Sequence, residues 1–168
     1  MKTETPRDLF FDQLRDLYSV ETQLAASLPR LVTLTASPEL RELLMRHTDQ
    51  TDQQRAKLIG IFDLHGLAPG NDKCKAMEGL IEGGDAHLKG VSEPTTRDLM
   101  MIAHCLRIEH YEIAAYGITQ RLAEGLGLST EARILKEILA EEEREARSLR
   151  VLECPIFNEA IYCTSDGE

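Results

Sequence analysis

The chain has 168 residues, of which 42% are hydrophobic, and this length fits a single domain with a substantial core. Its formal net charge of −10 argues against nucleic acids and anionic membrane surfaces as partners, because both attract basic patches. No apolar run approaches the roughly 18 residues that a membrane span needs, and the polar N-terminal segment lacks a signal-peptide pattern, so we expect a cytoplasmic protein.

The first half of the chain predicts two long helices. Residues 5–36 form the first, because Thr5 is followed by a proline and, three residues after Thr5, by Asp8, which is typical of a capped helix start. The second helix, 37–65, opens in the same way with Ser37 followed by a proline. Since the connection between them is short, we expect these two helices to pack antiparallel.

The second half predicts one short and two long helices. A short, glycine-weakened helix covers residues 73–88, and a long helix covers 95–124. The last helix, 129–154, begins with a serine that we expect to be its cap, and Pro155 is expected to end it. Residues 156–168 are therefore predicted to be a C-terminal tail.

These elements predict an all-α fold. Two antiparallel helix pairs are joined by one long crossover that carries the short extra helix, and this order is typical of a ferritin-like four-helix bundle. We assign residues 1–155 to the bundle and find no pattern typical of a β-strand.

Three glutamates occupy the centres of apolar helix faces: Glu21, Glu109 and Glu142. On a helical wheel of about 100° per residue, leucines, isoleucines and other apolar residues surround each of them. An unpaired carboxylate in an apolar interior must lose its charge or acquire a cation. Three such residues on separate, converging helices therefore indicate a metal site.

Further candidate ligands share these faces. Each of the last two long helices repeats a glutamate after three residues, which places both carboxylates on one side of the helix. The second helix adds one imidazole as a candidate ligand. It also adds two amides, which are weaker ligands and suit hydrogen bonding to the ligands. Carboxylates with an occasional imidazole are typical of di-iron and di-manganese helical bundles. The full candidate set is Glu21, His47, Gln50, Gln54, Glu109, Glu112, Glu142 and Glu145.

Other polar residues receive structural interpretations. The alternative to metal binding is that the central glutamates lie near an open end of the bundle or pair with basic residues, of which Arg46 and Lys57 are the nearest candidates. Glu141 and Glu143 lie at about 100° on either side of Glu142, so we expect them in solvent. Two tyrosines on inner faces are expected to pack with their hydroxyls bonded to a carboxylate; these are Tyr18 and Tyr116.

Several stretches carry a family resemblance. They read LYSVETQL at 17–24, SPEL at 37–40, CKAMEGLIE at 74–82 and IEHYEIAAYG at 108–117. On these stretches the chain resembles the YciF/YciE family of bacterial stress-associated ferritin-like proteins, over about residues 8–152. The resemblance implies a four-helix ferritin-like bundle, a homodimer and a dinuclear metal site that holds iron.

The resemblance also implies which residues form the site. The family pattern is matched at Glu21, Glu109, Glu112 and Glu142. It is not matched at Gln50 and Ala146, where the family usually carries carboxylates, whereas Glu145 is a carboxylate gained. The resemblance also implies a stress-associated role. From the inward carboxylates we expect metal binding with iron oxidation or handling of peroxide or O2, with two iron ions in a complete site and manganese or zinc as other candidates. The alternative is a non-catalytic helical homodimer that acts through protein contacts and retains a vestigial site.

Overall fold

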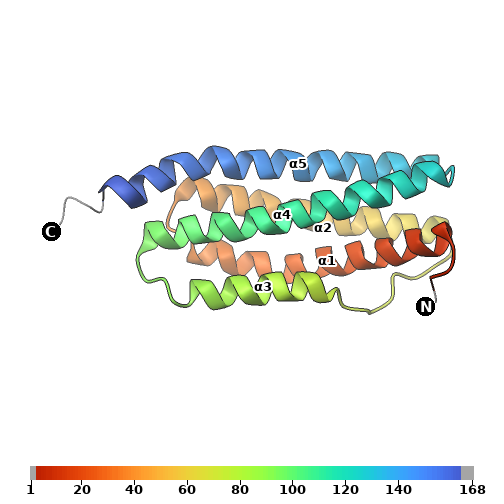
Figure 1. The fold of residues 1–168 in the computed structure, drawn as a ribbon, viewed down its shortest axis with the longest axis horizontal. Coiled ribbons are helices and arrows are strands. Elements are labelled where there is room, and N and C mark those ends of the chain that lie inside the picture. The colour runs from red at the N-terminus through yellow and green to blue at the C-terminus, as the bar shows by residue number, and fades with distance from the viewer. Residues whose placement is uncertain (1–2, 164–168) are drawn as a thin grey trace.

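The structure is a computed structural model that describes residues 3–163, and no strand occurs within this range. The predicted all-α class is confirmed, and Figure 1 shows the arrangement of the helices. The helices are α1 (Pro6–Leu34), α2 (Pro38–Leu64), α3 (Lys75–Leu88), α4 (Pro94–Gly125) and α5 (Ser129–Asn158), followed by a π-helical segment (Glu159–Cys163). Residues 164–168 of the predicted tail lie outside the described residues.

Side chains cap three of the long helices at their N-termini. Thr5 and Asp8 form the expected capping box at α1, and the Ser37 hydroxyl accepts a hydrogen bond from the backbone N–H of the third residue of α2. At α4 the cap is Glu93, whose carboxylate accepts the backbone N–H groups of Thr95 and Thr96. These caps satisfy backbone donors that the first helical turn leaves free.

Two predicted features of α5 are wrong. Ser129 is its first helical residue and not its cap; the cap position is Leu128, which provides no side-chain hydrogen bond. The helix also does not end at Pro155 but continues to Asn158. A proline inside a helix removes one backbone hydrogen bond, and here the helix continues because Ile156 is buried in the hydrophobic core.

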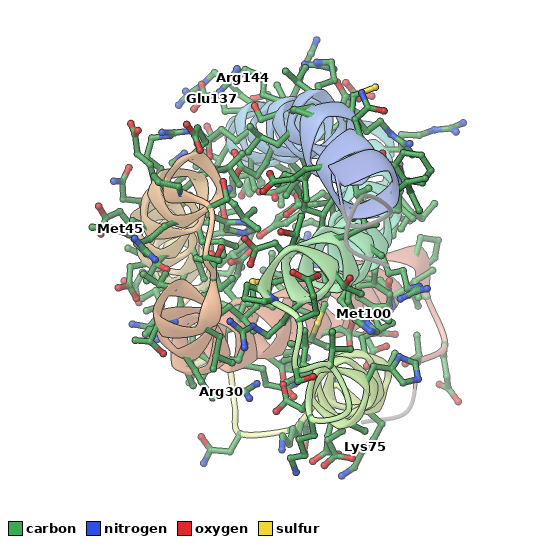
Figure 2. The ribbon with its side chains drawn as sticks, turned by 90° about the vertical axis from the view of Figure 1, so that its left-hand side faces the viewer. Arg30, Met45, Lys75, Met100, Glu137 and Arg144 are labelled. Carbon is green, nitrogen blue, oxygen red and sulfur yellow. The ribbon has the colours of Figure 1, made fainter. Side chains whose placement is uncertain are left out.

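The four long helices pack side by side (Figure 1). Helix α1 packs on α2 and on α4, and α5 packs on α4 and on α2. Figure 2 looks along the helices and shows α3 beside this group, where it contacts α4 and α1. None of the helices in the described part of the chain has the length and apolar character needed to cross a membrane.

Two hydrophobic clusters fill the interior, and a layer of polar side chains separates them along the helices. Helix α2 shows the order clearly, because Leu44 belongs to the first cluster and Leu58 to the second, with polar residues between them. The same change from one cluster to the other occurs on α4 between Ile108 and Tyr116. We call this set the polar layer; its buried members are Glu21, His47, Thr51, Gln54, Glu109, Glu112, Glu142 and Glu145.

Candidate metal centre

Four side chains of the polar layer converge: His47 of α2, Glu109 and Glu112 of α4, and Glu142 of α5. Each offers one nitrogen or oxygen atom, and these atoms all lie within 4.8 Å of one another. Glu109 and Glu112 reach the same point because residues three apart share a helix face. All four side chains are buried, so the group is enclosed by protein.

The other two predicted glutamates lie beside this group and are not part of it. Glu21 of α1 is completely buried, and its carboxyl group interacts directly with that of Glu112. The hydroxyl of Tyr116 donates a hydrogen bond to Oε1 of Glu21. Glu145 of α5 is also buried, close enough to Glu109 for their charges to interact.

The two predicted glutamines differ in their contacts. Gln54 is completely buried, and its Nε2 donates hydrogen bonds to Oε1 of Glu142 and, at 3.1 Å, to Oε2 of Glu141. Gln50 is half-buried, and its Nε2 has no protein hydrogen-bond partner. Gln54 therefore orients one carboxylate of the converging group.

Most of the buried carboxylate oxygens have no hydrogen-bond partner in the protein other than a neighbouring carboxyl group. His47 Nδ1 lies 3.2 Å from Oε1 of Glu109 but not in hydrogen-bonding geometry. The unpartnered oxygens are Oε2 of Glu21, both oxygens of Glu109, both oxygens of Glu112, Oε2 of Glu142 and Oε1 of Glu145. Buried polar atoms in native proteins nearly always have partners, so an unpartnered set of this size indicates a group that binds cations or protons.

Basic side chains do not neutralise the converging carboxylates. Within residues 3–163, the ion pairs of lysines and arginines involve other acidic residues; the basic candidate Lys57 pairs with Glu141 at 2.8 Å. Arg46 forms its ion pair with exposed Glu42 and contributes a weaker electrostatic effect at Glu145. The alternative in which an arginine or a lysine forms an ion pair with each central glutamate is therefore wrong for Glu21, Glu109 and Glu142.

Burial sets the protonation of the group in the absence of a cation. It raises the pKa of Glu21, Glu109 and Glu112 well above the usual carboxyl value, and neighbouring carboxylates raise it further. Burial likewise raises the pKa of Glu142 to about 7. It lowers the pKa of His47 to about 4, so the imidazole is neutral near pH 7 and keeps a free lone pair.

This donor set fits a transition-metal ion. Carboxylate oxygens with one neutral imidazole suit Fe(II), Mn(II) or Zn(II), and a bound cation would favour the ionised carboxylates that burial disfavours. The enclosure also limits access of bulk water. The polar layer can therefore bind protons or divalent cations, and its two kinds of occupant compete.

The structure corrects one prediction beside this group and supports another. Glu143 is exposed, as expected, but Glu141 is not simply solvated, since it contacts both Gln54 and Lys57. Sequence reasoning missed these contacts because they come from α2, and a wheel of α5 alone carries no signal for them. Of the two tyrosines, Tyr116 bonds a carboxylate as expected, whereas Tyr18 lies edge-on against a phenylalanine ring.

The amino-acid sequence is similar to a known protein family and to a known bacterial protein. Residues 5–161 match the family model described as Domain of unknown function (DUF892). Protein YciF of Escherichia coli (strain K12) is 35% identical over 159 residues, which are 94% of this chain and 95% of that protein.

Solved structures agree with this relationship. The crystal structure of the E. coli stress protein YciF matches with a TM-score of 0.89 at 34% identity, covering 93% of this chain and 99% of that chain. YcfI from Rhodopseudomonas palustris matches with a TM-score of 0.86 at 32% identity, covering 89% of this chain and 95% of that one. The predicted resemblance is therefore confirmed, and the chain belongs to the DUF892 family, as a relative of YciF.

Proposed function

We propose that this chain is a ferritin-like metal-binding protein whose four long helices form the bundle and whose polar layer holds a dinuclear iron site. One observation carries the proposal: buried carboxylates converge with a neutral imidazole, and most of their oxygens have no partner in the protein other than one another. Leaving so many buried acceptors unpaired is costly unless a cation binds them.

The negative charge of the buried glutamates supports the binding of two divalent ions. When ionised, Glu21, Glu109, Glu112 and Glu142 carry four negative charges, which two divalent cations neutralise. Their ligands would be His47 and these glutamates, with Glu145 as a further oxygen donor. Fe(II) held by these residues would be the electron donor in oxidation by O2 or peroxide, and the enclosing helices would exclude bulk water. Manganese and zinc fit the same donors and are the other candidate ions.

The biological setting is proposed from the relatives. YciF of E. coli is described as a stress protein, and we extend a stress-associated role to this chain. We also propose that it acts in the cytoplasm as a homodimer.

Anaerobic reconstitution with Fe(II) tests the proposed function. The expected result is two iron ions per chain by elemental analysis after gel filtration, followed by oxidation of the bound Fe(II) when O2 or peroxide is added. Glu109→Gln should reduce the bound iron, whereas Glu143→Gln, which removes an exposed charge on the same helix as Glu142, should not. Wild-type protein with neither bound iron nor oxidation above buffer would contradict the proposal.

A second candidate is a non-catalytic helical homodimer that acts through protein contacts and retains a vestigial site. It is favoured by the composition of the site, because Gln50 supplies a neutral amide and only four of the six predicted glutamate and histidine ligands converge within 4.8 Å. This candidate predicts that Glu109→Ala leaves the melting temperature unchanged or raises it, with added metal having no effect. The metal site predicts that the same substitution abolishes stabilisation by metal.

A further inference from the structure

The seam between α2 and α5 is lined by polar side chains at the level of the polar layer. Of the neighbouring pairs of long helices, α2 and α5 contact each other least. The polar side chains along this seam are Arg46, Gln50, Gln54 and Lys57 from α2, and Glu141 and Glu145 from α5. The seam thus combines sparse packing with side chains that can solvate an ion.

The other neighbouring pairs of long helices are packed more closely than α2 and α5. Helix α3 packs against α4 and α1, the two long helices that do not form this seam (Figure 2). Helix pairs α1–α2 and α4–α5 make the most extensive contacts of the fold. Along the helices, the two hydrophobic clusters close the polar layer on both sides. The α2–α5 seam provides a polar connection from the partly exposed Glu141 to the converging group.

A chain of contacts crosses this seam from its surface to the converging group. Lys57 Nζ lies 2.8 Å from Oε1 of Glu141, and these side chains are 31% and 20% exposed. The other oxygen of Glu141 accepts a hydrogen bond from Gln54, which also donates to Glu142. The amide oxygen of Gln54 is buried without a partner, so this position also offers an unused cation ligand.

We propose that the α2–α5 seam is the route by which divalent cations reach the polar layer, with Glu141 as the first carboxylate to receive them. Lys57 closes the route by occupying Glu141. An incoming divalent cation displaces the ammonium group from Glu141 and then passes the Gln54 amide oxygen to Glu142. This inference rests on the proposed function, because it requires that the polar layer binds metal.

Rates of metal binding to the full chain test the route. Anaerobic stopped-flow absorbance with Co²⁺ alone as the probe measures association, and chelator competition measures the equilibrium dissociation constant. Glu141→Gln leaves the Lys57 charge at the surface and should slow association about tenfold, whereas Lys57→Gln frees the carboxylate and should accelerate it. Both variants lose the same ion pair. Changes of opposite sign in their association rates would therefore come from electrostatic steering of the cation and not from loss of the pair.

A second ion pair on α5 supplies matched controls. Exposed Glu143 follows Glu142 on the side of α5 away from Glu141. Its Oε2 lies 3.9 Å from Nη1 of exposed Arg147. Glu143→Gln and Arg147→Gln make the same charge changes away from the seam and should alter association far less. Circular dichroism should show that all four variants fold, since partly exposed ion pairs contribute little to stability.

Each outcome bears on one of the two proposals. Equal slowing by Glu141→Gln and Glu143→Gln, or rate changes of the same sign for Glu141→Gln and Lys57→Gln, would overturn the route while leaving metal binding intact. Wild-type protein that binds no Co²⁺ at equilibrium would instead overturn the proposed metal site. Slower association with opposite effects of the two seam variants and silent controls would establish the route.

Discussion

The hydroxyl of Tyr116 on α4 donates a hydrogen bond to Oε1 of Glu21 on α1 at 2.5 Å, and both side chains are completely buried. This contact ties two helices together within the polar layer and leaves only Oε2 of Glu21 without a partner. Tyr116 therefore fixes the orientation of the one glutamate that α1 contributes.

Replacing Tyr116 by phenylalanine should destabilise the metal-free protein by about 1–3 kcal/mol, because the substitution leaves a buried acceptor without its donor. Urea-induced unfolding measures the change in the free energy of unfolding. Tyr18→Phe is the matched control, since Tyr18 is half-buried and packs edge-on against Phe62 at 6.5 Å between ring centroids. Equal losses of unfolding free energy from the two substitutions would show that the hydrogen bond from Tyr116 to Glu21 does not stabilise the fold.

Replacing Glu142 by glutamine should distinguish destabilisation of the fold by a buried charge from its stabilisation by bound metal. Above the pKa of about 7 of Glu142, the metal-free variant should melt at the same temperature as wild type or higher, because no buried carboxylate ionises there. The Gln54 amide can still donate to the new amide oxygen, so the hydrogen bond is retained.

Added metal should have the opposite effect on this variant. Saturating Mn²⁺ at 100 times its dissociation constant stabilises wild type by about 2.7 kcal/mol, and Glu142→Gln should lose most of this gain. Glu143→Gln should keep it. If Mn²⁺ raises the melting temperature of Glu142→Gln as much as that of wild type, Glu142 does not bind the metal.

Helical periodicity predicts the four long helices and the face that each buries, and it places Glu21, Glu109 and Glu142 inside. Such patterns are local, and the structure agrees with them wherever one helix determines the outcome. The pairing of Glu109 with Glu112 is predicted equally well, because both residues lie on one helix face.

Relations between helices could not be predicted in the same way. The relative rotation and stagger of the helices decide that Glu112 joins the converging group and that Glu145 lies beside it. Lys57 reaches Glu141 from another helix, so a wheel of α5 alone wrongly indicates a solvated side chain. Pro155 shows the same limit, since burial of Ile156 outweighs the local tendency of proline to end a helix.

The metal-free protein should lose stability as the pH rises through the titration of its buried glutamates. Their pKa values are raised in the folded state, so their contribution is complete below the ordinary carboxyl value and is lost as the pH rises. For Glu142 this loss spans 4.5 to about 7. His47 acts in the opposite direction, because its pKa is lowered from 6.5 to about 4, but the five buried glutamates with raised pKa values outweigh one imidazole.

Metal should reverse the sign of this pH dependence. A bound cation needs ionised carboxylates and neutral His47, so its affinity rises with pH over the same window. Melting temperatures measured across the window with EDTA should therefore fall, and those measured with Mn²⁺ should rise. A metal-free curve that rises through the window, or that Glu142→Gln leaves unchanged, would contradict the raised pKa of this group.

Asp98 on α4 holds the connection between α1 and α2, a role that sequence reasoning missed because the contact spans about sixty residues. Its buried carboxylate accepts backbone hydrogen bonds from Ala36 at 3.0 Å and from Ser37 at 2.6 Å. Asp98→Ala should therefore reduce the free energy of unfolding by about 2–3 kcal/mol, because two backbone donors lose a charged acceptor. Urea-induced unfolding measures this loss, and Asp98→Asn should recover part of it through its amide oxygen.

The control is Glu39→Gln, since exposed Glu39 accepts only from the Ser37 hydroxyl. Because Asp98 lies outside the polar layer, Asp98→Ala should leave the bound metal per chain unchanged, and a loss of metal would mean that this connection positions the site.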